Sequence, residues 1–350
     1  MPHINTEYSA DSVEFCPGAD ILVCGTYQLS ERASDDPSLD AAELSSKQNK
    51  RLGRCLVYQI GVEDSSISEI QRFGLPAVLD MKWCHGKYEE GSILAIADAE
   101  GRITLHRLNN DQRKIRLEQV FQCAPPDVLC LSLDWSNRRW GDAHSASLIV
   151  SRSDGELSLL RCANGDMREV MSWHAHEFEP WIAAWNYWDA NIVYSGGDDC
   201  KLKGWDVRQD PAQPTFVNRR FDAGVTTIQS HPHVEHIFAV GSYDASVRLF
   251  DARKPLAPLS TSGVGGGVWR VKWHPSAARS QDLLVACMHD GFKVVRFGET
   301  YAEEAQIVKR YDAHDSLAYG VDWAFEKGEK SDTLIASCSF YDHSLHLWRG

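Results

Sequence analysis

Short apolar runs separated by turn residues dominate the chain, and residues 174–206 show their arrangement clearly. Bulky apolar residues alternate with other residues over 181–185, and two further apolar runs follow at 192–194 and 201–205. The segment Ser-Gly-Gly-Asp-Asp between the last two runs is typical of a tight turn. A period of two over short runs predicts strands, because an amphipathic helix would need a period of 3.6. We therefore expect a meander of three short strands here.

The last run of this meander recurs along the whole sequence, at intervals of 45–54 residues. Seven units at this spacing fit the WD-repeat period of about 40–45 residues, with loop insertions accounting for the excess. The sequence therefore predicts an all-β fold, a seven-bladed WD-repeat β-propeller, with residues 1–350 forming a single domain. The closing positions of the seven runs are Tyr58, His106, Leu160, Trp205, Phe250, Val295 and Trp348.

Four residues of the fourth unit match the marks of a WD repeat, namely His176, Ser195, Asp199 and Trp205. In that family these side chains form a hydrogen-bonded chain across the blade, which satisfies buried polar groups. We therefore interpret them as structural residues. Their similarity to a catalytic triad is not evidence of catalysis.

Closure of the ring and one insertion also have sequence signatures. The chain ends two residues after Trp348, so the last repeat lacks a fourth strand. Residues 3–8 precede the first innermost strand and are expected to supply that strand, which closes the ring. Residues 30–51 are polar and charged where a short turn belongs, and they predict a mobile loop insertion. Partner docking by this loop is an alternative to a simple insertion.

Composition and motifs narrow the function classes. The formal net charge of −13 argues against general nucleic-acid binding, which needs a basic surface. No apolar run approaches the length of a membrane span. Ten scattered cysteines form no C-x-x-C pair, so neither a zinc site nor a redox pair is indicated, and no cofactor is expected. Motifs of hydrolases, phosphate-binding loops and zinc proteases are missing, which favours a binding scaffold.

The topology of a propeller predicts where a site would lie. Loops that precede the innermost strands share one face with the turns between second and third strands. Carboxylates, aromatic rings and one arginine on that face predict a polar, ring-lined pocket, although ordinary solvated turns would also explain them. The residues concerned are Glu177, Glu179, Trp181, Asp198, Asp222, Tyr243, Trp269, Arg270, His289, Asp315, Tyr319, Phe340 and Tyr341.

Several stretches are more specific than a generic repeat. They include HEFEPW (176–181), YSGGDDC (194–200), GSYD (241–244), GGGVWRVKW (265–273) and HDSLAYGVDW (314–323). Together they resemble the diphthine methyltransferase family of WD-repeat proteins in diphthamide biosynthesis. The resemblance implies a cytoplasmic, monomeric esterase that demethylates methylated diphthine on translation elongation factor 2, giving diphthine and methanol. Elongation factor 2 would be the partner, with the amidating enzyme as a further candidate and no nucleic acid or membrane.

The residue types on the predicted face can be tested against this chemistry. Aromatic faces and carboxylates suit a trimethylammonium group. For ester hydrolysis, Arg270 or the amides of 265–267 could stabilise an oxyanion, and Glu179 or His289 could act as the base of a water-based mechanism. A non-catalytic adaptor that presents elongation factor 2 to the amidating enzyme remains the alternative. The expected substrate-binding residues are Glu177, Trp181, Asp198, Tyr243, Trp269 and Tyr341.

Overall fold

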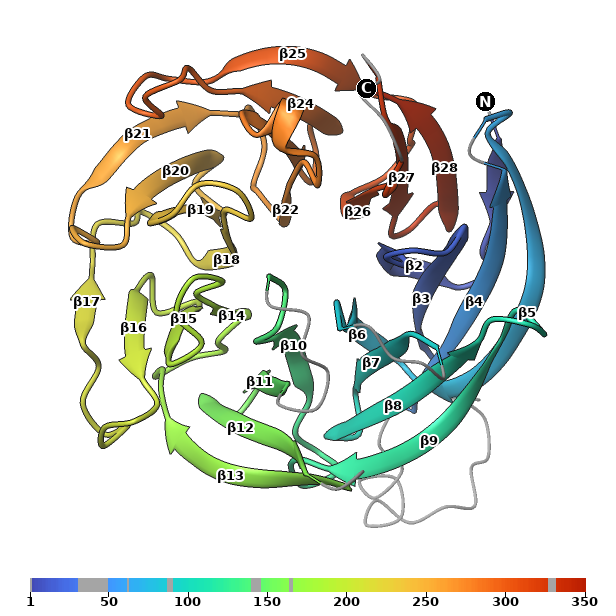
Figure 1. Ribbon diagram of the computed structural model, residues 1–350, viewed down its shortest axis with the longest axis horizontal. Helices are drawn as coiled ribbons and strands as arrows, with labels where there is room; N and C mark the ends of the chain where they lie inside the picture. The colour runs from blue at the N-terminus through green and yellow to red at the C-terminus, as the bar shows by residue number, and fades with distance from the viewer. Residues whose placement is uncertain are drawn as a thin grey trace, which may run out of the picture.

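Seven four-stranded sheets form a closed ring around a central axis in the computed structural model (Figure 1). The structure describes residues 2–30, 50–61, 63–86, 91–139, 146–163, 166–326 and 332–350. Six sheets use four strands that are consecutive in sequence, and the seventh has the order β1-β28-β27-β26. The predicted seven-bladed propeller is therefore confirmed. No helix in the described ranges is long and apolar enough to cross a membrane.

Each blade runs from an innermost strand to an outermost strand, and we number the blades in chain order. Blade 1 contains β2 (Ser9–Phe15), β3 (Ile21–Leu29), β4 (Arg51–Gly61) and β5 (Ser66–Pro76). Blade 2 contains β6 (Val78–Trp83), β7 (Ile93–Asp98), β8 (Arg102–Asn109) and β9 (Lys114–Gln122). Blade 3 contains β10 (Cys130–Trp135), β11 (Ser147–Arg152), β12 (Glu156–Ala163) and β13 (Asp166–His174). Blade 4 contains β14 (Ile182–Trp185), β15 (Ile192–Gly196), β16 (Leu202–Asp206) and β17 (Phe216–Asn218).

The remaining blades follow the same plan. Blade 5 contains β18 (Val225–Ser230), β19 (Ile237–Ser242), β20 (Ser246–Asp251) and β21 (Pro258–Gly263). Blade 6 contains β22 (Arg270–Trp273), β23 (Asp282–Ala286), β24 (Phe292–Arg296) and β25 (Gln306–Tyr311), with the 3-10 turn η1 (Ala277–Arg279) after its first strand. Blade 7 contains β26 (Ala318–Trp323), β27 (Leu334–Ser339), β28 (Ser344–Arg349) and β1 (His3–Asn5).

The N-terminal strand closes the ring, as the sequence predicts. In antiparallel register, His3 of β1 faces His346 of β28 and Asn5 faces Ser344. The amide of Thr6 donates to the carbonyl of His343 over 2.9 Å and extends the pairing by one residue. Because the first and last parts of the chain share one sheet, the ring has no open seam at blade 7.

The predicted insertion interrupts a strand pair without breaking it. Residues 31–49 of that insertion lie outside the described residues. On either side of them, Leu29 of β3 pairs with Arg51 of β4, and the amide of Ser30 donates to the carbonyl of Lys50 over 2.9 Å. The sheet of blade 1 therefore continues to the point where the insertion begins.

The hydrogen-bonded chain predicted for blade 4 is confirmed. Nδ1 of His176 lies 2.9 Å from Oδ1 of Asp199, and its Nε2 lies 2.7 Å from Oγ of Ser195. The indole of Trp205 donates to the same Oγ over 2.8 Å. Burial lowers the pKa of His176 even though Asp199 acts in the opposite direction, so the imidazole is neutral. The corresponding series of hydrogen bonds in blade 7 has an additional member. There the hydroxyl of Ser339 donates to Asp342 and also lies within hydrogen-bonding distance of Nδ1 of His314.

Replacing Asp199 by Ala should lower the free energy of unfolding by about 1–3 kcal/mol, because it leaves a buried imidazole nitrogen without its partner. Chemical denaturation measures this loss. The matched control is Asp210→Ala, which removes an exposed carboxylate from the same blade. It should change stability by less than about 0.5 kcal/mol. Equal stability of the two variants would contradict the structural role of Asp199.

A second set of hydrogen bonds joins neighbouring blades, and the sequence analysis did not predict it. Five innermost strands end in or near a tryptophan whose indole N–H donates to a backbone carbonyl of the preceding innermost strand. These bonds are 2.9–3.3 Å long. The signal was visible as a tryptophan at the end of the first run in five of the seven units, the exceptions being the runs that end at Phe15 and Ser230. The five residues are Trp83, Trp135, Trp185, Trp273 and Trp323.

Candidate functional site

The candidate site lies where the innermost strands begin. The innermost strands surround the axis of the ring (Figure 1), and contacts of Trp181 with Trp269 and of Trp269 with Tyr319 show that the N-terminal ends of β14, β22 and β26 meet at one end of it. Second strands run antiparallel to the first, so the turns after β15, β19 and β27 reach the same end. This is the face on which the sequence places its candidate residues.

Six aromatic side chains from blades 4 to 7 form a continuous series on this face. The ring centroids of Trp181 and Trp269 lie 5.7 Å apart, and those of Tyr243 and Trp269 lie 6.1 Å apart. Trp269 is 4.7 Å from Tyr319, which is 4.9 Å from the next ring. We call this series the aromatic arc, and its members are Trp181, Tyr243, Trp269, Tyr319, Phe340 and Tyr341. The structure thus brings together all four aromatic residues that the sequence assigned to substrate binding.

The indole of Trp269, at the centre of the arc, has an unmet hydrogen-bonding group. Its Nε1 is buried and has no hydrogen-bond partner among the described residues, whereas Nε1 of Trp181 donates to Oδ1 of Asp198 over 2.7 Å. A buried donor without an acceptor costs about 1–3 kcal/mol, so such a group needs an explanation. An acceptor atom on a bound substrate would supply the missing partner.

Glycines allow the loops of the arc to approach one another closely. A Cβ on Gly224 would lie 2.4 Å from Oδ1 of Asp198 and 3.2 Å from the ring of Tyr243. A Cβ on Gly266 would lie 2.1 Å from the carbonyl oxygen of Cys287. The backbone carbonyl cannot move aside, so position 266 needs glycine, whereas a side chain at position 224 would displace the Asp198 carboxylate from its place beside the arc.

The predicted carboxylates take different places around the arc. The carboxylate of Asp198 contacts the arc, because it accepts the hydrogen bond from the indole of Trp181. Glu177 is exposed, and its Oε1 lies 4.0 Å from Nε2 of His174. Glu179 is partly buried, and its backbone carbonyl accepts from the amide of Asp198 over 3.0 Å. Glu179 therefore helps to fix the loop of Asp198, and no contact in the described ranges joins its carboxylate to a ring of the arc.

The two predicted catalytic residues of blade 6 lie apart from each other. His289 is exposed in the turn between β23 and β24. Arg270 is buried, with its guanidinium 3.3 Å from Oδ1 of Asp80 on β6. Arg270 therefore points into the channel and contributes positive charge below the arc, where sequence reasoning expected it on the face itself.

Sequence reasoning missed Asp11, a buried carboxyl on β2 that is 6 % exposed. It is the extra residue of a β-bulge, and the matching bulge positions on β6, β10 and β18 are Leu79, Leu131 and Thr226. Bulges redirect a side chain at strand ends and often lie beside active sites. No hydrogen bond or ion pair holds the Asp11 carboxyl within the described part of the chain. The available signal was an acidic residue where other units carry apolar residues or threonine.

The surroundings of Asp11 explain its electrostatics. Burial raises its pKa to about 8, with Arg270 opposing the shift and Asp80 adding to it. Burial, together with Asp11, also raises the pKa of Tyr319 in the arc. The Asp11 carboxyl and the Tyr319 phenol of the arc therefore influence each other electrostatically. Among the described residues, no group of three His, Cys, Asp or Glu side chains could hold a metal ion.

Comparison with known proteins identifies the relatives of this chain. No family model matches it. Human diphthine methyltransferase is 42% identical over 337 residues, which cover 92% of this chain and 74% of the relative. The diphthine methyltransferase homolog of Dictyostelium discoideum is 34% identical over 377 residues, covering 98% and 96%. A chain in the crystal structure of the mitotic checkpoint complex shares the fold with a TM-score of 0.72, at 16% identity, covering 100% of this chain and 91% of that one. The identity and coverage of the first two relatives show that this chain belongs to the diphthine methyltransferase family.

Proposed function

We propose that the protein hydrolyses the methyl ester of methylated diphthine on translation elongation factor 2, releasing diphthine and methanol in the cytoplasm. Membership of the family supports a role in diphthamide biosynthesis. The observation that carries the proposal is the aromatic arc beside the Asp198 carboxylate at one end of the channel. This combination suits the unusual side chain of the substrate, which has a fixed positive charge and an ester.

The trimethylammonium group of the proposed substrate explains why the site is lined by aromatic rings. A trimethylammonium group has no N–H to donate, so ordinary acceptors cannot hold it well. Aromatic faces attract it through their negative quadrupole, each contributing about 0.5–2 kcal/mol. Asp198, fixed by the indole of Trp181, adds an opposite charge beside the rings. The arc therefore anchors the end of the side chain that does not react.

The ester requires an activated water and a group that stabilises negative charge. In our proposal Asp11 takes a proton from a water molecule, whose oxygen then attacks the ester carbonyl. The N–H of Trp269 donates to the carbonyl oxygen as it becomes an oxyanion. When the bond to the methoxy oxygen breaks, methanol leaves with the proton that Asp11 held. One water is consumed, and one carboxylate, one methanol and one proton are produced.

Replacing Trp181 by Ala should raise KM about two- to thirty-fold, the equivalent of one lost cation–π contact. The loss falls on KM because the anchor binds the substrate and the transition state equally. Phe178→Ala is the matched control, because Phe178 is an aromatic residue of the same loop and is 61% exposed. Steady-state kinetics compare the two variants. A Trp181→Ala enzyme with the KM of the control would remove this ring from the site.

Replacing Trp269 by Phe keeps an aromatic ring in the arc and removes only the N–H donor. We expect kcat to fall by about 10²-fold, as for the loss of one oxyanion donor. Stability should not fall, because the described structure shows no hydrogen bond for this N–H to lose. Kinetics and thermal melting of the same preparation test both statements. An unchanged kcat would mean that this N–H does not contact the reacting carbonyl.

The reaction itself is tested by incubating the pure protein with elongation factor 2 that carries methylated diphthine. Intact-mass measurement should show the loss of one CH₂ unit, and methanol should appear in equal amount. A protein that binds this elongation factor without changing its mass would act as an adaptor. A mass gain on unmethylated diphthine with a methyl donor would show the opposite reaction. Either result would overturn the esterase proposal.

A further inference from the structure

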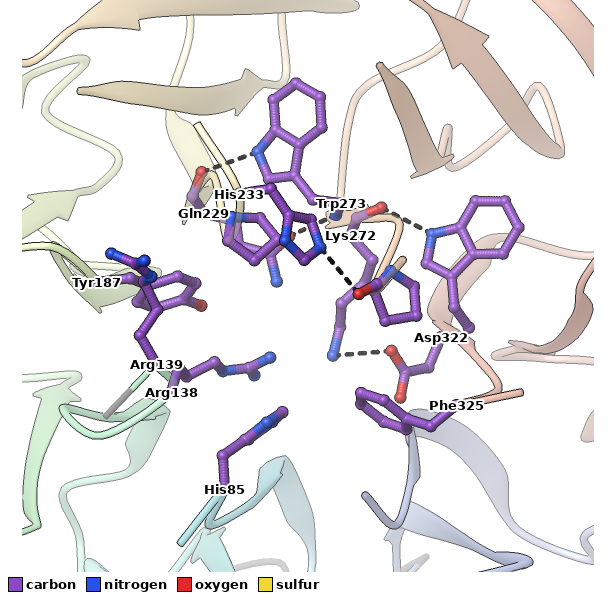
Figure 2. A pocket seen from close by; sticks show the side chains of 13 residues that line it. His85, Arg138, Arg139, Tyr187, Gln229, His233, Lys272, Trp273, Asp322 and Phe325 are labelled. Atoms are coloured by element: carbon purple, nitrogen blue, oxygen red, sulfur yellow. Dashed lines mark hydrogen bonds and ion pairs between the residues drawn. The ribbon is translucent and has the colours of Figure 1, made fainter. Parts of the chain in front are cut away.

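The end of the channel opposite the aromatic arc contains a cavity of about 310 Å³ (Figure 2). It lies between the C-terminal ends of the innermost strands, whose N-terminal ends carry the arc. Side chains reach it from several blades, and Figure 2 shows Arg138 and His85 directed toward its centre opposite Lys272. We call this space the basal cavity. Its volume falls at the lower end of the range for small-molecule sites.

The lining of the basal cavity has more cationic than acidic side chains, unlike the protein as a whole. The chain has a formal net charge of −13, yet the described lining contains three cationic side chains and only one carboxylate, Asp322. That carboxylate is already engaged, because its Oδ2 accepts from the amide of Phe15 over 2.8 Å and its Oδ1 lies 3.3 Å from Nζ of Lys272. Lys272 is neutralised by Asp322 and by Glu14, whose Oε1 lies 2.6 Å from its Nζ, so the positive charge of the lining that favours an anionic ligand is that of its arginines.

Arg138 has hydrogen-bonding capacity that the described residues do not use. Its Nε is buried and has no hydrogen-bond partner there. The carboxylate of Asp134 lies 3.7 Å away, beyond good hydrogen-bonding distance, and the ring of Tyr187 lies 5.5 Å from the guanidinium carbon. A buried guanidinium with an unmet N–H is costly unless an acceptor can reach it.

His85 lies beside Arg138 on the wall of the cavity. Burial lowers the pKa of His85 well below its usual value, and Arg138 and Lys272 add to this effect. The ring is therefore neutral and has one N–H to donate. Phe325 packs against it with 5.7 Å between the ring centroids. The neutral imidazole therefore offers the anion one hydrogen-bond donor.

We propose that the basal cavity binds a small oxyanion, a phosphate or carboxylate group, through Arg138 and His85. Guanidinium groups bind both kinds of oxyanion by charge-assisted hydrogen bonds. The volume of the cavity limits the occupant to a small molecule. This site is separate from the ester-hydrolysing site, because the two occupy opposite ends of the innermost strands.

The test is isothermal titration of the whole protein with inorganic phosphate, and in a second arm with acetate, at constant ionic strength. The wild-type protein should bind at least one of the two, which identifies the preferred oxyanion. Arg138→Met should weaken binding at least tenfold. Arg253→Met is the matched control, because Arg253 forms an exposed ion pair with Asp251 on the outside of blade 5. Failure of the wild-type protein to bind either anion, or equal binding by Arg138→Met, would overturn the proposal.

A second variant keeps the proposal testable if Arg138→Met fails to fold. His85→Phe keeps an aromatic ring of similar size and removes only the N–H, and it should weaken binding several-fold with unchanged thermal melting. Tetramethylammonium, a probe for the aromatic arc, should bind equally well with and without phosphate. Competition between tetramethylammonium and phosphate would place the anion at the arc and reject the basal cavity.

Discussion

Replacing Asp11 by Asn should lower kcat by about 10²–10⁴-fold, the usual contribution of a positioned general base. The amide has almost the same shape as the carboxyl but cannot accept a proton from water. Asp11 makes no hydrogen bond or ion pair in the described structure, so the exchange breaks no structural contact. The loss should therefore appear in catalysis and not in folding.

The pH dependence gives this prediction a second readout. Burial raises the pKa of Asp11 to about 8, so the carboxyl is protonated over most of the range below pH 8. A base must be deprotonated, and kcat/KM of the wild-type enzyme should rise with pH until about pH 8. The amide side chain of the variant does not titrate in this range, so its residual activity should lose that rising limb.

Stability should change in the opposite direction to activity. The folded state holds the Asp11 proton more tightly than the unfolded state, so this group stabilises the fold below its unfolded pKa. That contribution is lost as pH rises from the unfolded value of 3.8 to about 8. Asp11→Asn should therefore melt at the same temperature as the wild type or higher, with a gap that widens toward pH 8.

Asp20→Asn is the control for this experiment, because Asp20 is an exposed carboxylate just after the same strand. It should leave kcat, its pH profile and the melting temperature unchanged. An Asp11→Asn enzyme with normal turnover would rule out Asp11 as the base and return attention to Glu179 and His289. A variant that is inactive because it melts early would show that Asp11 is structural.

The fold could be predicted because the repeat leaves local marks. The spacing of the closing positions and the His-Ser-Asp-Trp set of blade 4 depend on turns and strands that each unit builds from its own residues. The aromatic members of the arc could also be placed on one face, because in a propeller the strand direction alone decides which loops meet. Neither inference needed contacts between distant residues.

The chemistry near the axis could not be predicted in this way, because it depends on contacts between blades. Arg270 follows Trp269 directly in sequence, yet one residue belongs to the arc and the other pairs with Asp80 inside the channel. A β-bulge places Asp11 at the level of the arc, and an extra residue in a strand leaves little trace in the apolar pattern. The unmet donors of Trp269 and Arg138 appear only when all neighbouring blades are in place.

The channel below these groups contains ion pairs that hold several blades together. Nζ of Lys272 on β22 lies 2.6 Å from Oε1 of Glu14 on β2 and 3.3 Å from Oδ1 of Asp322 on β26. Glu14 also lies 3.1 Å from Nζ of Lys82 on β6. Burial alone would raise the pKa of Glu14, but Lys272 and Lys82 outweigh it and hold this pKa at about 2. Lys272 is therefore the partner on which two buried carboxylates depend.

Replacing Lys272 by Met should lower the free energy of unfolding by about 3–5 kcal/mol, the range for breaking a buried ion pair from one side. The side chain of Met has a similar length, so the loss reports charge more than volume. Lys309→Met makes the same exchange at an exposed position of β25 and should change stability by less than about 0.5 kcal/mol. Denaturant unfolding at pH 7 compares the two variants.

The same variant should respond differently to acid. With its pKa lowered in the fold, Glu14 stabilises the wild type fully above the unfolded value of 4.5, and this stabilisation is lost as pH falls toward 2. Without Lys272 the folded pKa of Glu14 should rise, so the variant should lose less stability between pH 5 and pH 3 than the wild type loses. Because the gap between the two proteins then narrows in acid, unfolding measured across this range separates an electrostatic cause from a packing defect. A gap of the same size at every pH would assign the loss to packing and contradict the role of Lys272 as the central cation of the channel.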